Sequence, residues 1–366
     1  MRGSNNVTKF DLFATIVVTV IGTGIFSLPS QLSEIVGSEG WIVVLLTGII
    51  IGVIVIVQCK ALEVNKYDRI DLLLENNFGK VVGKFISFFI VVAGLVIVSL
   101  ELRVFTEVLK MYLLEKTPAE LIIIIMLLTG TFLIRGELES VIMFNEIAFY
   151  LMFVPIILAI PFIINGADFT NNLPIFDHKP IEYFEAFKTQ FFSFIGFGII
   201  FMVHPFLKEK RELPKVALKS VGFITIFYAL IVMISLAVFP EEYNKNLLWP
   251  TISMVSIVDI PGAFIERWEG IAMIFWIFFY FTTFINIYYF TSDIVKNTLN
   301  LRTVKITSLI IIPVIYIFSL YPSNLTELYS IEKLVMPFID TIVIGVIPIT
   351  VLMLNFIKKG SGSNES

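Results

Sequence analysis

Cysteine and histidine are scarce in this 366-residue chain. The single cysteine, Cys59, excludes an intrachain disulfide, and His178 and His204 are the only histidines. No group of these residues has the spacing of metal ligands, so we expect no metal site. No nucleophile–base pair is evident either. We therefore expect no enzymatic activity, no cofactor and no nucleic-acid partner.

Charged residues are also few. They make up 15% of the chain and hydrophobic residues 57%, whereas soluble domains contain about 25% and about 45–50%. The mean hydropathy is +0.91. The first apolar run is longer than the apolar core of a signal peptide and no A-x-A-like site follows it, so no cleavable signal is expected. This composition predicts an integral, multi-pass membrane protein in contact with lipid.

Long apolar runs separated by polar loops recur along the chain. A transmembrane helix takes about 20 residues, whereas a membrane strand takes about ten residues of alternating pattern. The runs are apolar nearly all round, which favours helices, and they predict an all-α membrane protein with ten transmembrane helices. The runs cover residues 10–36, 41–62, 82–113, 119–134, 141–164, 187–206, 216–239, 263–291, 306–321 and 332–357.

Basic residues are distributed unevenly between the two sides of this predicted topology. With the N-terminus in the cytoplasm, 18 of the 26 Lys and Arg residues lie on the inner side and six on the outer side. Cytoplasmic loops carry such an excess. The bias therefore predicts that both termini are cytoplasmic, in agreement with an even number of crossings.

Two similar glycine pairs interrupt apolar runs in the two halves of the chain. Residues 21–25 read IGTGI and residues 195–199 read IGFGI. Glycine weakens a helix, and backbone groups freed within a membrane are tolerated only where they line a cavity or hold a ligand. The pairs lie in runs one and six, so they predict two inverted five-helix repeats, 10–164 and 187–357, with unwound first and sixth helices. Close packing of helices at small residues is the alternative.

The segment VIGTGIFSLP, residues 20–29, resembles the first-helix signature of the amino acid–polyamine–organocation permease superfamily. That resemblance implies unwound first and sixth helices, whose backbone N–H groups bind a substrate carboxylate and whose carbonyls bind its amine beneath an aromatic lid. The residues so implicated are Gly22, Thr23, Gly24 and Ile25 in the first run and Phe194, Gly196, Phe197 and Gly198 in the sixth.

A longer stretch, residues 246–284, is similar to the corresponding region of the B subunits of spore germinant receptors, with Glu266-Arg267-Trp268-Glu269 as its central motif. The resemblance implies an A subunit and a lipoprotein C subunit as partners, and the inner membrane of a bacterial spore as location. We expect a single permease-like domain over residues 1–357, followed by a polar tail at 358–366.

Several polar residues inside the runs are further candidates. Glu101, Arg103 and Glu107 in the third run predict a structural or gating ion pair, since residues four apart share a helix face. Thr282 and Thr283 lie where related sodium-coupled transporters bind a cation, so that resemblance implies a possible cation site. At the start of the eighth run, Glu266 and Arg267 are either a helix start or a gate.

Three functions fit this sequence. The first is a germinant-sensing subunit that binds a free amino acid or similar small zwitterion and signals by a conformational change. The second is an amino-acid secondary transporter that uses the same pocket. The third is a water or ion conduit, or a scaffold with a vestigial pocket; few polar residues in the runs speak against a conduit.

Overall fold

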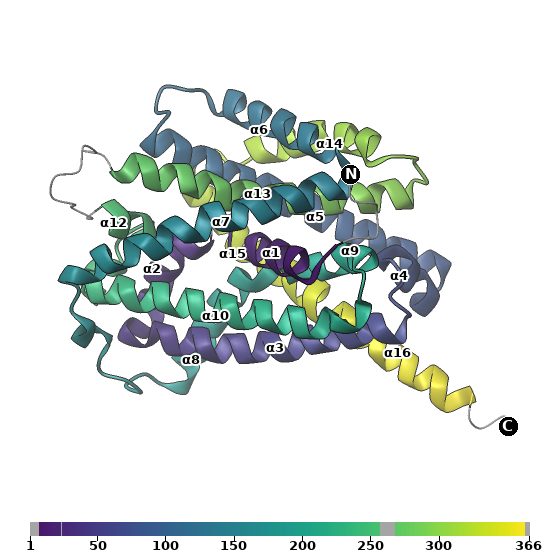
Figure 1. Ribbon diagram of the computed structural model, residues 1–366, viewed down its shortest axis with the longest axis horizontal. Coiled ribbons are helices and arrows are strands. Elements are labelled where there is room, and N and C mark those ends of the chain that lie inside the picture. The colour runs from purple at the N-terminus through teal and green to yellow at the C-terminus, as the bar shows by residue number, and fades with distance from the viewer. Residues whose placement is uncertain (1–6, 23, 257–267, 363–366) are drawn as a thin grey trace.

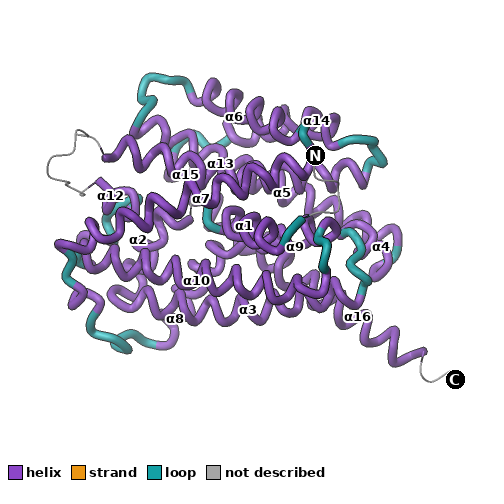
Figure 2. The backbone as a smooth tube through the Cα atoms, in the orientation of Figure 1, coloured by secondary structure: helices purple, strands orange, loops and turns teal. Residues whose placement is uncertain are grey.

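The computed structural model describes residues 7–22, 24–256 and 268–362, and within them helices dominate (Figures 1 and 2). The only strand-like feature of these residues is a bridge between Val7 and Leu207. The prediction of an all-α protein is confirmed. The helices are α1 Lys9–Val20, α2 Gly24–Val36, α3 Gly40–Val64, α4 Ile70–Phe78, α5 Lys80–Tyr112, α6 Ala119–Ile134, α7 Glu137–Ile163, α8 Pro180–Phe191, α9 Ile200–Val203, α10 Leu213–Val238, α11 Glu241–Asn244, α12 Pro250–Ser256, α13 Trp268–Thr298, α14 Val304–Leu320, α15 Leu325–Asp340 and α16 Ile347–Gly362.

These helices follow the order of the ten predicted runs. The first run corresponds to α1 and α2, the sixth to α8 and α9, and the tenth to α15 and α16, while α4 lies in a loop. In the described part of the chain, five continuous helical stretches are long and apolar enough to cross a membrane alone, and the bent pair α8–α9 makes a sixth. Helices α6 and α14 are apolar but shorter. Because α16 reaches Gly362, the helix extends into the segment expected to be a tail.

The long helices run roughly along one direction, with α3 beside α10 at one edge and α6 beside α14 at the other (Figure 1). Small residues allow some of them to approach closely. A Cβ on Gly48 of α3 would lie 2.2 Å from Oγ1 of Thr225 on α10, and one on Gly94 of α5 would lie 2.1 Å from Oγ1 of Thr291 on α13. Such contacts are typical of membrane helices, where packing rather than the hydrophobic effect holds helices together.

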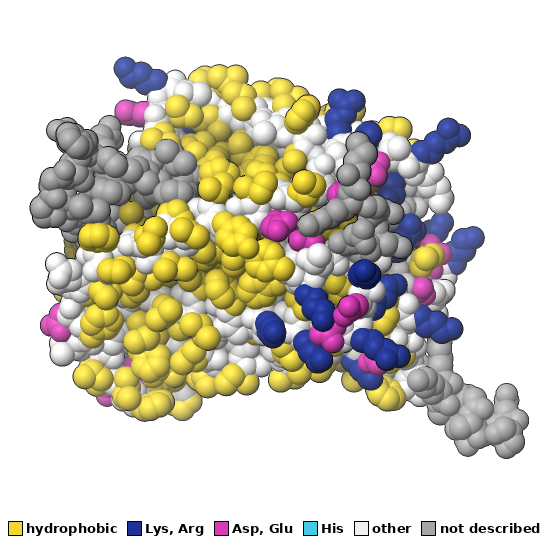
Figure 3. Space-filling view, in the orientation of Figure 1, with side chains coloured by type: hydrophobic (Ala, Val, Ile, Leu, Met, Phe, Trp, Pro, Cys, Tyr) yellow, Lys and Arg dark blue, Asp and Glu magenta, His cyan; other side chains and the backbone are white. Residues whose placement is uncertain are grey.

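The outer surface carries many exposed apolar side chains, including Ile49 and Val53 of α3 and Phe132 of α6. Figure 3 shows them across most of one face, while Lys and Arg gather toward the end of the molecule where α4 and α9 lie. An apolar belt with basic residues at one end is the surface expected of a protein embedded in lipid.

The start of the first crossing lies beside the end of the sixth. A capping box begins α1, because the Asp11 amide donates to Thr8 Oγ1 over 3.2 Å and the Thr8 amide donates to Asp11 Oδ2 over 2.8 Å. The bridge from Val7 to Leu207 joins this start to the segment that follows α9. The N-terminal end of the first crossing and the C-terminal end of the sixth are thus in direct contact.

Candidate functional site

The first crossing loses its helix where the first glycine pair stands. Helix α1 ends at Val20 and α2 begins at Gly24. Between them Ile21 has φ −80° and ψ 78°, outside the helical region, while Thr23 lies outside the described residues. The interruption leaves carbonyls at the end of α1 and N–H groups at the start of α2 without partners in their own helix.

The sixth crossing also leaves α-helical geometry at its glycine pair, and it does so as a tighter 3-10 helix, η4, over Phe192–Ile199. Runs of 3-10 helix longer than three or four residues are uncommon and often mark strain or a hinge. The segment therefore stays hydrogen-bonded to itself, unlike the gap between α1 and α2.

One glycine of each pair lies against the other interrupted crossing. A Cβ on Gly196 would lie 2.8 Å from the Cα of Val20 and 2.9 Å from the carbonyl oxygen of Thr19, so only glycine allows η4 to touch the end of α1. A Cβ on Gly24 would lie 3.4 Å from Oγ of Ser193. The first and sixth crossings are thus in backbone contact at their glycine pairs. The repeated motif predicted an interruption in each crossing but not this contact between them.

The freed carbonyls of α1 are met by side chains from α10 and α13. The hydroxyl of Tyr228 lies 3.1 Å from the carbonyl oxygens of both Val20 and Ser193, and its single hydrogen serves one of them at a time. It therefore joins the two interruptions. Tyr228 was not identified from the sequence; a tyrosine within the apolar seventh run was the available signal.

Thr282 and Thr283 lie against the same end of α1. The Thr282 hydroxyl lies 2.9 Å from the carbonyl oxygens of Val18 and of Phe279 in its own helix, and its single hydrogen serves one of them at a time. The Thr283 hydroxyl lies 3.1 Å from the carbonyl oxygen of Thr19. A Cβ on Gly22 would lie 2.6 Å from Thr283 Oγ1, so this glycine packs directly on the threonine. These oxygens are hard ligands of the type that alkali and alkaline-earth cations take, but the cation site remains a prediction.

A pair of side-chain amides continues these polar contacts toward the N-terminal end of α1. Asn145 of α7 and Asn286 of α13 exchange hydrogen bonds of 2.8 and 3.2 Å, and Asn286 also donates to Thr19 Oγ1 over 2.7 Å. Both asparagines are fully buried. These hydrogen bonds between uncharged side chains hold α1 against α7 and α13.

The aromatic residues of η4 form a wall beside the gap. Phe194 and Phe197 are fully buried, their rings lie 6.5 Å apart at 10°, and Phe194 meets the Tyr228 ring edge-on at 5.4 Å. Beside Gly198 the position of a Cβ has no other atom within 4 Å. The predicted aromatic residues thus pack next to the break, and only the Gly198 side of the glycine pair borders open space.

Proline frees two more backbone carbonyls, and side chains from other helices take both. Proline lacks an N–H, so Pro29 leaves the carbonyl of Ile25 unpaired, and Thr251 of α12 donates to it over 2.9 Å. Pro348 likewise frees the carbonyl of Ile344, which accepts from Gln58 over 3.2 Å.

Ile344 belongs to a π-helical segment, η7, over Thr341–Val346 in the tenth crossing, which contacts η4. Such segments occur frequently at functional sites. This third irregular crossing was not predicted from the sequence, although Pro337, Gly345 and Pro348 flank or occupy it.

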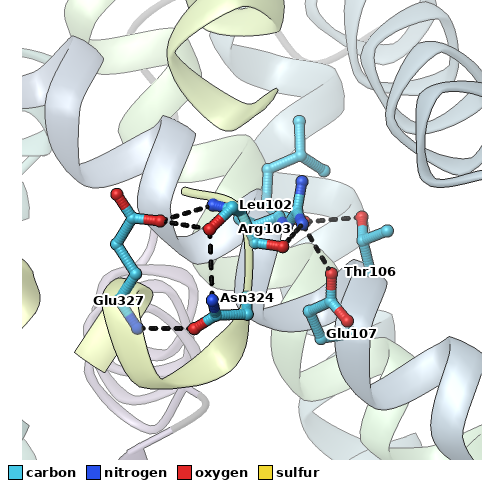
Figure 4. A network of polar contacts seen from close by, with 7 residues as sticks. Leu102, Arg103, Thr106, Glu107, Asn324 and Glu327 are labelled. Atoms are coloured by element: carbon cyan, nitrogen blue, oxygen red, sulfur yellow. Dashed lines mark hydrogen bonds and ion pairs between the residues drawn. The ribbon is translucent and has the colours of Figure 1, made fainter. Parts of the chain in front are cut away.

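The charged residues of α5 bond to the start of α15 (Figure 4). Arg103 lies 2.9 Å from Glu107 and donates to the carbonyl of Ser323 over 3.5 Å. Ser323 and Asn324 in turn bond to Glu327. This network holds two crossings together, and its predicted role in gating stays a prediction. Glu266 and Arg267 lie outside the described residues.

His204 is held by backbone carbonyls at the C-terminal end of the sixth crossing. Its ring nitrogens lie 3.1 Å from the carbonyl oxygen of Ile200 and 3.2 Å from those of Tyr67 and Asp68. The residue fastens the loop after α3 to the end of α9.

A family model described as spore germination protein matches residues 6–328. The chain belongs to this family. Among its relatives, spore germination protein A2 of Bacillus subtilis (strain 168) is 30% identical over 332 residues, 88% of this chain and 89% of that protein. Spore germination protein GerLB of Bacillus cereus is 26% identical over 368 residues, 100% of this chain and 98% of the relative. The resemblance found in the sequence is confirmed.

Solved structures identify the fold of this spore germination family member. A substrate-bound, outward-open Na+-coupled sialic acid symporter aligns with a TM-score of 0.65, 14% identity, 94% of this chain and 80% of that one. A nucleobase-cation-symport-1 family transporter in a closed conformation aligns with a TM-score of 0.59, 11% identity, 97% of this chain and 94% of that one. The chain is thus a multi-pass membrane protein with a transporter fold, and the expectation that it is not an enzyme agrees with its permease family.

Proposed function

We propose that this chain is the germinant-sensing subunit of a spore germinant receptor and that it binds a small amino acid or similar zwitterion between the two interrupted crossings. One observation carries the proposal: the two interrupted crossings lie against each other, with Gly196 on Val20 and Gly24 beside Ser193, and the carbonyls of Val20 and Ser193 share one hydroxyl.

This geometry supplies groups for both ends of a zwitterion. The N–H groups at the start of α2 carry partial positive charge and suit a carboxylate. Carbonyls at the end of α1 and in η4 suit an ammonium group. The residues we assign to this site are those of the sequence prediction, Gly22, Thr23, Gly24, Ile25, Phe194, Gly196, Phe197 and Gly198.

Binding would be signalled by a change in the arrangement of the crossings. A ligand that contacts both α2 and η4 binds more tightly to the conformation in which these two segments lie together, so it raises the population of that conformation. The ratio of its affinities for the two conformations sets how far the populations shift. We further propose that A and C subunits receive this change and that the chain lies in the inner membrane of the spore. The excess of Lys and Arg on one side of the predicted topology is our reason for proposing cytoplasmic termini. We further propose one domain over residues 1–357, with repeats at about 10–164 and 187–357.

An active secondary transporter is the second candidate, because both solved structures with this fold are transporters. It would use the same pocket with alternating access. Uptake of a radiolabelled amino acid into proteoliposomes separates the two: sensing predicts binding without accumulation, and transport predicts both.

The main experiment is a thermal-unfolding screen of the purified chain against the common amino acids. At a concentration of about 100 times Kd, a ligand stabilises a protein by about 2.7 kcal/mol. We expect at least one amino acid to stabilise the native chain and the Gly222→Leu control. Gly222 lies on α10, and a Cβ at its position would have no other atom within 4 Å. Gly24→Leu, which presses on Ser193, should lose that stabilisation.

The proposal is wrong if no amino acid stabilises the native chain, or if Gly24→Leu responds as well as Gly222→Leu does.

A further inference from the structure

Two half-helices, α2 of the first crossing and α8 of the sixth, extend from the interruptions to the same end of the molecule. They pack against each other. At the interruptions, a Cβ on Gly24 at the start of α2 would lie 3.4 Å from Oγ of Ser193, which follows α8. At their far ends, α2 leads into the short helix η1 Gly37–Glu39, and the loop after α7 leads into α8. The α2–α8 pair therefore lies between the proposed ligand site and this end of the molecule.

A buried carboxylate joins the far ends of this pair. Glu39 of η1 is fully buried. Its Oε2 accepts from the backbone N–H of Phe176 over 2.9 Å, and its Oε1 accepts from that of Asp177 over 2.8 Å. Nδ1 of His178 lies 2.9 Å from the same Oε1, and it donates because an ionised carboxylate only accepts. Helix α8 begins at Pro180, two residues later, so the carboxylate holds the segment that leads directly into it.

The loop is attached through its backbone rather than through buried side chains. Residues 173–177 are exposed, and the Phe176 side chain is 73% exposed. Phe176 has φ 63°, in the left-handed region that is strained for a bulky residue, and this turn directs successive N–H groups toward one anion. The hydroxyl of Ser38 also donates to the carbonyl of Pro174 over 2.8 Å. Because these contacts are polar, the loop can leave Glu39 without exposing a large apolar surface.

We propose that Glu39 is a latch that controls access to the ligand site between α2 and α8. While its carboxylate holds residues 176–178, the far ends of the two half-helices stay together. When these hydrogen bonds break, the half-helices can separate and a solute can pass between them. The predicted topology places this end on the outer side of the membrane, where a solute arrives. The latch rests on the proposed function and adds the route by which the ligand reaches its site.

The latch is coupled to the site through the same two half-helices. A ligand that contacts the start of α2 and the segment after α8 holds the pair together at the interruptions, and Glu39 holds it together at the far ends. Two interactions that favour the same conformation strengthen each other. Closure of the latch therefore favours a bound ligand, and a bound ligand favours closure.

Modification of a cysteine measures access without any ligand. Ser193→Cys in a Cys59→Ala background places one thiol where α2 meets the end of α8. The purified full-length chain is treated with a water-soluble methanethiosulfonate that carries a quaternary ammonium group. We expect slow modification while Glu39 is present. Glu39→Gln should accelerate it about 10- to 100-fold, because hydrogen bonds to charged groups are the strong ones and an amide nitrogen cannot accept them.

Three controls separate access from other effects. Glu34→Gln removes the same charge from an exposed glutamate of α2, and it should leave the rate unchanged. The natural Cys59, buried on α3, reports opening of the whole bundle, and its modification should stay slow in Glu39→Gln. His178→Ala removes one of the hydrogen bonds, and Glu39→Asp keeps the charge with a shorter reach. Both should give intermediate rates, so they test the latch even where Glu39→Gln fails to fold.

Rapid modification of Ser193→Cys with Glu39 present would overturn the latch, because the route would already be open. A rate that stays unchanged in Glu39→Gln, Glu39→Asp and His178→Ala would overturn it as well. Equal acceleration at Cys59 would mean that Glu39 stabilises the whole bundle instead.

The latch and the proposed function can fail separately. An amino acid that stabilises the native chain but not Gly24→Leu, together with an unchanged modification rate, would remove the latch and leave the proposed function standing. Faster modification in Glu39→Gln without stabilisation by any amino acid would do the reverse.

Discussion

The first and sixth crossings carry nearly the same pentapeptide and have different structures. In the first, the helix stops at Val20 and resumes at Gly24. In the sixth, the chain continues through the glycines as a 3-10 helix over Phe192–Ile199. The difference shows that a glycine pair permits an interruption but does not decide its form. The form depends on whether neighbouring helices offer partners for the freed backbone groups.

The first crossing has such partners. Hydroxyls of Thr282, Thr283 and Tyr228 reach the last carbonyls of α1, and Thr251 reaches the carbonyl of Ile25. The sixth crossing instead keeps its own hydrogen bonds and supplies aromatic surface. We infer that the first crossing provides the polar contacts of the site and that the sixth provides its wall.

The largest expected effect comes from Gly196→Ala, which tests whether contact with the first crossing fixes η4. The added Cβ would lie 2.8 Å from Val20 Cα, and a backbone cannot move aside as a side chain can. We expect a loss of about 3 kcal/mol in the free energy of unfolding, at the upper end of overpacking effects. Titration with SDS in mixed micelles measures it.

Gly198→Ala is the matched control in the same 3-10 segment. No atom lies within 4 Å of its added Cβ, so the change should stay within about 0.5 kcal/mol. Equal losses at the two positions would show that the 3-10 backbone, and not contact with α1, determines the cost.

Tyr228→Phe should have the next largest effect, because it removes the hydroxyl shared by the two crossings. The carbonyl of Val20 or Ser193 would then be buried without that donor, at a cost of about 1–2 kcal/mol in unfolding free energy. The same titration measures it. Tyr243→Phe, an exposed tyrosine of α11, should change little; a similar loss in both would contradict a bridging role.

The smallest expected effect concerns the proline-freed carbonyl in the first crossing. Thr251→Val should cost about 1 kcal/mol of unfolding free energy by removing the donor to Ile25. In a Pro29→Ala background the alanine N–H can bond to that carbonyl, so the same substitution should cost less. A double-mutant cycle measures the coupling, and additive costs would show that Thr251 does not replace the missing N–H.

The sequence predicted the helical class, the order of the crossings and the location of both interruptions. Apolar run length and glycine spacing are local properties, so they can be read without a structure. It did not predict Tyr228, the Asn145–Asn286 pair, or the π-helical segment at Thr341–Val346. The roles of Tyr228 and of the asparagine pair depend on which helices are neighbours, because their partners are distant in the sequence. The π-helical segment is local, but its flanking prolines and glycine do not by themselves distinguish a π-helix from a simple bend.

The amino-acid sequence by itself determined that this chain crosses a membrane as helices and that two crossings are weak at their centres. The reason is that lipid tolerates only helices with satisfied backbones, and glycine lowers the cost of departing from them. Only the tertiary structure decided that the two weak points lie against each other, and that the first crossing leaves its helix there while the sixth tightens into a 3-10 helix. Those outcomes depend on hydrogen-bond partners that packing brings together from distant parts of the chain.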